Sequence, residues 1–95
     1  MSNNYQALGE YTAYKMQARD AFRRRHVIAN NLGVELQRLA ERADKQIDAD
    51  EASAQIREIA AAEKEAHAAL ARANQAAPLC GQQELTAAML LNERI

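Results

Sequence analysis

The sequence predicts an all-α protein, an antiparallel, coiled-coil-like helical hairpin with a long first helix and a short C-terminal third helix. Apolar residues recur at steps of three, four or seven on both sides of residues 48–51, as the buried face of a helix requires. The 95-residue chain has a single proline, Pro78, so long stretches are free to be helical. We expect one small domain over residues 1–95, with helices over 5–45, 49–76 and 82–93.

The first helix is expected over residues 5–45, which contain no proline. The polar residues 2–4 before it can accept the hydrogen bond that caps its N-terminus. Gly33 costs about 1 kcal/mol relative to alanine in a helix interior, so a kink at 30–33 is the alternative to a straight helix. An unbroken helix of this length spans about 60 Å, and its N-terminal half would therefore project from the hairpin or pair with a partner.

Two apolar rows form the expected hairpin seam on either side of the pivot at residues 48–51. The rows are Ala29, Leu32, Leu36, Leu39, Ala43 and Ile47, and then Ala52, Ile56, Ile59, Ala66, Leu70, Ala73 and Ala77. Glu63 interrupts the second row, and it either pairs with an Arg or Lys of the first helix or extends into solvent. Because alanine buries much less area than leucine, the seam gains little hydrophobic free energy. We therefore expect a marginal monomer that gains burial by dimerisation or by docking on a larger partner.

The second helix is expected to begin at Ala49 and to end near Ala76. Asp48 and Glu51 have the spacing of a capping box, which marks a helix start. Pro78 ends the helix, because proline disfavours helical geometry in the residue before it. After a turn at residues 77–81, the third helix carries enough apolar side chains to fold back on the hairpin.

The inventory of reactive side chains argues against catalysis. The chain has two histidines and one cysteine, fewer than the four Cys or His ligands of a structural zinc site. It contains no HExxH, CxxC, GxSxG or phosphate-binding glycine loop. The lone Cys80 excludes an internal disulfide, and no apolar run suits a signal peptide or a membrane helix. We expect a non-enzymatic, cytoplasmic protein without cofactor, metal or membrane partner.

Charge is divided unevenly along this chain of net charge −1. Residues 1–45 carry eight Lys or Arg and five Asp or Glu, whereas residues 46–95 carry four and eight. This division suits the arms of an antiparallel hairpin, or a dimer. Lys15, Arg19 and Arg23 recur at four-residue steps and form a ladder that can follow phosphates. The alternatives are an acidic protein surface and a solvated face balanced by nearby carboxylates.

The tyrosines and the only phenylalanine all fall within the first 22 residues. Tyr11, Ala18 and Phe22 share one helical stripe, which indicates core, but an exposed aromatic face that awaits a partner is the alternative. Arg25 lies where this stripe should continue, which indicates an interface rather than a self-contained core. The candidate partner-binding residues are therefore Tyr5, Tyr11, Tyr14, Phe22, Arg23, Arg24 and Arg25.

The segment Gln46-Ile47-Asp48-Ala49-Asp50-Glu51 resembles the bend of the Rop-type plasmid copy-number regulators. Those proteins are helical hairpins that dimerise into a four-helix bundle and bind paired RNA hairpins. In size, helicity and lack of catalytic motifs, the chain is similar to small phage- or plasmid-encoded helical accessory proteins, such as the anti-RecBCD proteins of temperate phages. That resemblance implies a protein that binds a host enzyme.

Three functions follow from these observations. The first is a non-catalytic protein-binding module, of the phage accessory type, that modulates a larger host nucleic-acid-processing enzyme. The second is a dimeric, Rop-like hairpin that binds RNA or DNA through Lys15, Arg19 and Arg23, together with Arg24 and Arg25. The third is a structural subunit in which the first helix serves as a coiled-coil arm.

Overall fold

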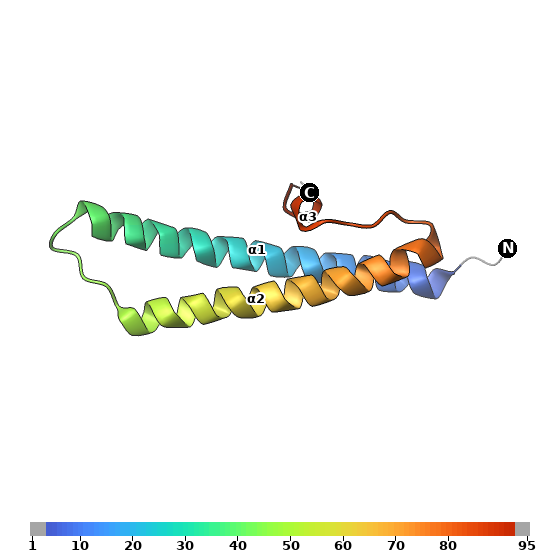
Figure 1. Cartoon of the computed structure of the whole chain (residues 1–95), viewed down its shortest axis with the longest axis horizontal. Coiled ribbons are helices and arrows are strands. Elements are labelled where there is room, and N and C mark those ends of the chain that lie inside the picture. The colour runs from blue at the N-terminus through green and yellow to red at the C-terminus, as the bar shows by residue number, and fades with distance from the viewer. Residues whose placement is uncertain (1–3, 93–95) are drawn as a thin grey trace.

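The computed structural model describes residues 4–92, and in this range the chain is helical without any strand (Figure 1). Its elements are α1 (Tyr5–Glu41), α2 (Ala49–Ala76), the 3-10 helix η1 (Ala77–Cys80) and α3 (Ala87–Asn92). The prediction of an all-α protein is confirmed. Glu93, where the third helix was expected to end, lies outside the described residues, as do Ser2 and Asn3 among the candidate N-caps.

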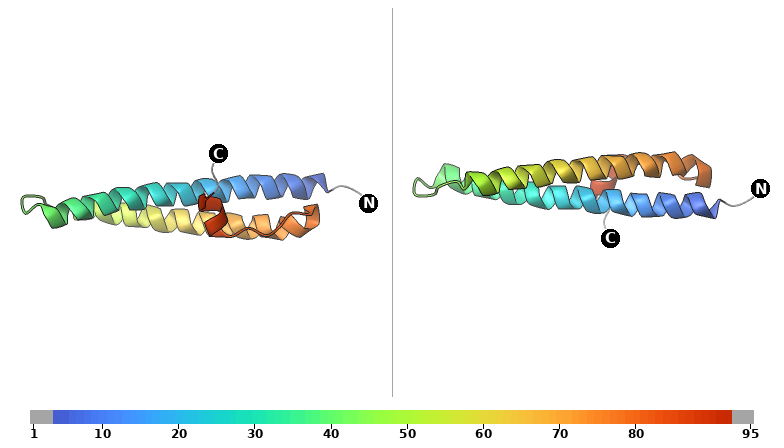
Figure 2. Two further views of the ribbon diagram at one scale, coloured as in Figure 1. Left: turned by 90° about the horizontal axis from the view of Figure 1, so that it is seen from above. Right: turned by 90° about the horizontal axis from the view of Figure 1, so that it is seen from below.

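The two long helices lie side by side and run in opposite directions, joined by a loop at residues 42–48 (Figures 1 and 2). The molecule measures 68 × 23 × 15 Å. We call the end that carries this loop the distal end, and the opposite end the proximal end. The N-terminal half of α1 does not project, contrary to expectation, because it packs on the C-terminal half of α2.

α1 begins at an asparagine cap and continues through its interior glycine. The side chain of Asn4 accepts a hydrogen bond from the backbone N–H of Ala7 at 3.0 Å. Helical geometry is unbroken at residues 30–33. The helix ends at Glu41 rather than at residue 45, because the loop must cross to α2 before Asp48 can cap that helix. Arg42 accordingly has extended backbone angles, φ −129° and ψ 114°.

α2 occupies the range 49–76 that the sequence indicates. The side chain of Asp48 accepts a hydrogen bond from the backbone N–H of Glu51 at 3.0 Å, which supplies the N-cap. Pro78 lies in the first turn of η1, directly after α2. Gly81 then adopts φ +72°, a left-handed conformation that glycine takes without steric cost, and the chain turns back.

The core of the molecule is rich in alanine and lies near the proximal end. Of thirteen buried apolar residues in the described range, nine are alanines. The large members are Tyr11, Phe22, Leu85 and Leu90. No residue between Phe22 and Ala62 is buried. The row expected from Ala29 to Ile47 therefore does not form a closed seam, and the core uses Tyr11, Phe22 and the C-terminal segment in its place.

The C-terminal segment returns along the helix pair and covers the proximal core (Figures 1 and 2). α3 begins at Ala87 instead of residue 82, because residues 82–86 form no helix and run back along the helix pair (Figure 1). Asn74 holds this stretch by accepting from the backbone N–H of Leu85 at 2.7 Å and donating to the Leu85 carbonyl at 2.9 Å. This stretch carries Leu85 and Leu90 into the core, where they are 8% and 1% exposed.

Candidate interaction surface

The aromatic residues that were expected to face a partner are divided between the core and the surface. Tyr11 and Phe22 are 7% and 3% exposed, and the Phe22 ring meets the His67 ring edge-on, with 5.2 Å between centroids. Tyr14 is half-buried, and Arg72 donates to its hydroxyl at 3.1 Å. Only Tyr5, at 73%, is well exposed. The core interpretation therefore holds for Tyr11 and Phe22, which cannot reach a partner in this conformation.

The arginine cluster is engaged with α2 across the helix pair. The Arg25 Nε atom lies 2.6 Å from Glu63 Oε1, and Arg24 pairs with Glu65. The alternative that Glu63 pairs with a basic residue of the first helix is thus the one observed. Arg25 interrupts the apolar stripe because it closes this ion pair, which bridges the end of the core. Arg23 is half-buried.

The basic ladder does not present three equivalent side chains. Arg19 is only 15% exposed, its Nε lies 3.7 Å from Asp20 Oδ1, and that nitrogen has no hydrogen-bond partner. Lys15 and Arg23 are both half-buried. A phosphate-binding row needs side chains that extend freely into solvent, and Arg19 does not meet this requirement.

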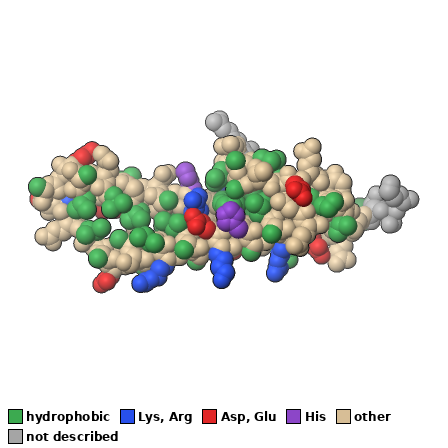
Figure 3. Space-filling view, viewed as in Figure 1, with side chains coloured by type: hydrophobic (Ala, Val, Ile, Leu, Met, Phe, Trp, Pro, Cys, Tyr) green, Lys and Arg blue, Asp and Glu red, His purple; other side chains and the backbone are tan. Residues whose placement is uncertain are grey.

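An open groove lies between α1 and α2 at the distal end, with a volume of about 330 Å³. We call it the distal groove. Its apolar lining is Leu32, Val34, Leu36, Leu39, Ile47 and Ala52, and its polar lining is Asn31, Glu35, Arg38, Lys45, Gln46, Asp48, Glu51 and Gln55. Figure 3 shows hydrophobic side chains gathered along this half of the molecule.

The apolar side chains of the distal groove are only partly covered. Val34, Leu36 and Ile47 are 49%, 46% and 53% exposed, and Leu32 and Leu39 are half-buried. At the proximal end the C-terminal segment covers the helix pair. At the distal end, no described segment covers the helix pair. The distal groove thus has a mixed lining, in which this helix pair leaves apolar side chains partly in contact with water.

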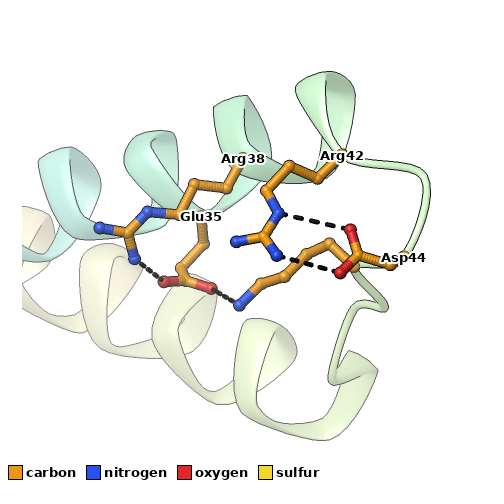
Figure 4. A network of polar contacts seen from close by, with 5 residues as sticks. Glu35, Arg38, Arg42 and Asp44 are labelled. Carbon is orange, nitrogen blue, oxygen red and sulfur yellow. Dashed lines mark hydrogen bonds and ion pairs between the residues drawn. The ribbon is translucent and has the colours of Figure 1, made fainter.

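A network of charged side chains lies at the loop end of the distal groove, and its members Glu35, Arg38 and Lys45 line the groove (Figure 4). Glu35 lies between Arg38 and Lys45, at 3.2 Å and 3.6 Å respectively. Arg42 binds the carboxylate of Asp44 through two hydrogen bonds, at 3.3 Å and 3.0 Å. These contacts tie the loop to the end of α1 and hold that side of the groove in place, although each exposed pair contributes at most about 1 kcal/mol.

The described residues offer no group of three or more His, Cys, Asp or Glu placed to hold a metal ion. The single thiol, Cys80, is half-buried and donates weakly to the carbonyls of Ala76 and Ala77, at 3.4 Å and 3.5 Å. Over residues 4–92, no helix is both long and apolar enough to cross a membrane. The distal groove is therefore the candidate functional site that the geometry offers.

Comparison with protein-family models, with curated proteins and with solved structures gave no significant match.

The distal groove was missed because its leucines were assigned to a buried seam. A count from the loop would have found it. Antiparallel arms that turn at residues 42–48 place Phe22 opposite residue 67, so the aromatic stripe faces the alanine-rich half of α2. The leucines of α1 then lie opposite the N-terminal half of α2, where Ala52 and Gln55 line the groove with them and leave them partly exposed.

Proposed function

We propose that this chain is a non-catalytic protein-interaction module that binds protein through the distal groove. The observation that carries the proposal is the contrast between the two ends of the coiled-coil-like hairpin. A closed, alanine-rich core stands at the proximal end, and partly exposed leucine, isoleucine and valine side chains line the distal groove. Clusters of exposed apolar side chains rimmed by polar residues can mark protein-interaction sites when they form a contiguous patch of a few hundred Å² or more.

The composition of the distal groove suits a protein partner. Interfaces have an apolar centre and a polar rim. Here Leu32, Leu36 and Leu39 form the centre, and Glu35 and Lys45 are part of the charged rim. A larger protein, such as the host nucleic-acid-processing enzyme implied by the phage-type resemblance, is one class of partner that would bind such a groove.

Nucleic-acid binding is supported less well. The salt bridges of Arg24 and Arg25 to α2 compensate two of the charges that a phosphate-binding face would need. Leucine and isoleucine side chains add nothing to phosphate recognition, which depends on cationic groups and backbone N–H donors. A protein partner can cover the exposed leucine, isoleucine and valine side chains of the distal groove, whereas a phosphate backbone would leave them in water.

The test compares two charge insertions in the same helix. Leu36→Glu places a carboxylate in the distal groove, and the matched control Met16→Glu changes a residue of α1 that is 48% exposed near the proximal end. Each tagged variant is co-expressed in bacteria with an untagged copy, the lysate is treated with nuclease, and captured proteins are quantified by mass spectrometry at moderate and high salt.

We expect Leu36→Glu to lose protein that the unchanged chain and Met16→Glu both retain, whether that protein is the untagged copy or another one. Equal capture by all three chains would contradict the proposal. Recovery of nucleic acid alone without nuclease, lost at high salt, would favour the basic ladder instead.

A further inference from the structure

We propose that a second copy of this chain covers the distal groove, so that the distal ends of two helix pairs pack face to face about a twofold axis. This inference deepens the proposed function and depends on it, since it names the protein that fills the groove. It follows from the surface area of the molecule, from the symmetry that such a contact requires and from the charges around the groove.

The first argument is surface area. The accessible surface is 6937 Å² for a chain of 10.5 kDa. A compact monomer of this mass exposes about 5,400 Å². The excess is about 1,500 Å², whereas a stable interface removes roughly 800 Å² from each partner. One contact with another copy would thus remove about half of this excess.

The second argument is that a second copy of the chain already carries the surface that would match the distal groove. In a twofold dimer the same patch serves both chains, so one contact covers both distal grooves. A different protein would have to supply a matching apolar face of its own. The second copy has that face already, with Leu36 and Ile47 each about half exposed.

The third argument is charge. The lining includes Glu35, Asp48 and Glu51 as well as Arg38 and Lys45, so both signs of charge occur around the distal groove. A surface of one sign would repel its own copy, but a mixed rim can pair with itself. The net charge of −1 adds little long-range repulsion between two chains.

The helices as wholes show the same complementarity. In α1, basic residues outnumber acidic ones by six to four, and in α2 acidic residues outnumber basic ones by five to three. A second helix pair that places its α2 beside this α1 therefore meets opposite net charge. The same charges support the pairing within each chain, so no helix must change partner for the dimer to form.

The experiment is sedimentation equilibrium of the purified full-length chain across a wide concentration range, with Leu36→Glu and Met16→Glu at matched concentrations. We expect a reversible dimer for the unchanged chain and for Met16→Glu. Leu36→Glu should raise the dimer dissociation constant at least about tenfold, because a twofold interface contains the buried carboxylate twice. Helix content by circular dichroism should be equal in all three chains, since Leu36 is not a core residue.

A chain that stays monomeric up to about 100 μM would overturn the proposal, because an interface of ordinary size binds more tightly than that. So would a dimer that Leu36→Glu and Met16→Glu weaken equally. A monomer that still captures another protein through Leu36 would refute the second copy and leave the interaction function standing. A monomer that captures nothing would refute both.

Discussion

Replacing Phe22 by alanine removes one of the four large side chains in the core, and the structure sets the size of the loss. An aromatic side chain buries roughly 150–250 Å², or about 4–6 kcal/mol at 25 cal/mol per Å². Alanine retains about a third of that. The void adds to the loss, because the neighbouring core residues include Ala18, Ala66 and Ala69, whose methyl groups cannot extend into it. We expect a total cost of about 4 kcal/mol, within the usual range for this substitution.

The consequence for such a small protein is severe. The free energy of unfolding of a domain of this size is about 5–14 kcal/mol, and an alanine-rich core favours the lower end of this range. Urea denaturation followed by far-UV circular dichroism, at one fixed protein concentration, should therefore show a midpoint lowered by more than half for Phe22→Ala. Met16→Ala, in the exposed part of the same helix, should stay within about 0.5 kcal/mol of the unchanged chain. A loss below about 1 kcal/mol for Phe22→Ala would refute the placement of this ring in the core.

Two further substitutions test other contacts. Asn74→Ala removes both hydrogen bonds to the backbone of Leu85, so the Leu85 amide should exchange with solvent at least tenfold faster, measured by hydrogen exchange; unchanged exchange would show that Asn74 does not hold the segment. A double-mutant cycle on Arg25 and Glu63 should give a coupling free energy below about 1 kcal/mol that decreases as salt is added, since both side chains are about two-fifths exposed. A larger coupling free energy that does not depend on salt would show that the pair is desolvated.

The helical elements could be predicted from the sequence because their signals are local. The cap at Asp48 and the stop at Pro78 each depend on neighbouring residues, and both lie where the sequence placed them. The end of the first helix was harder to predict, since it ends at Glu41 because the loop that follows must reach α2. The start of the third helix at Ala87 was harder still to predict. It depends on the hydrogen bonds between Asn74 and the backbone of Leu85, which are eleven residues apart in the chain.

The location of the core could not be read from apolar periodicity alone. Leucine-rich and alanine-rich rows give the same helical pattern, but only the register between the arms decides which row is covered. Phe22 and Leu90 become core residues because the C-terminal segment returns over α1, and no local pattern encodes that return. The distal groove stays open for the same reason, because the described part of the C-terminal segment, which ends at Asn92, does not cover Leu36 and Ile47.

The position of the core also has a consequence for the order of folding. The loop at residues 42–48 brings its flanking residues together first, but those residues bury little. Contacts in and beside the core join distant parts of the chain, since Arg25 and Glu63 are 38 positions apart and Tyr11 and Gln83 are 72 positions apart. The chain loses conformational entropy when these long loops close, and hydrophobic burial compensates for this loss only after closure. This protein should thus fold more slowly than its helical content suggests. The loop at residues 42–48 should be the last part to gain free energy from burial, although its flanking residues are close in sequence.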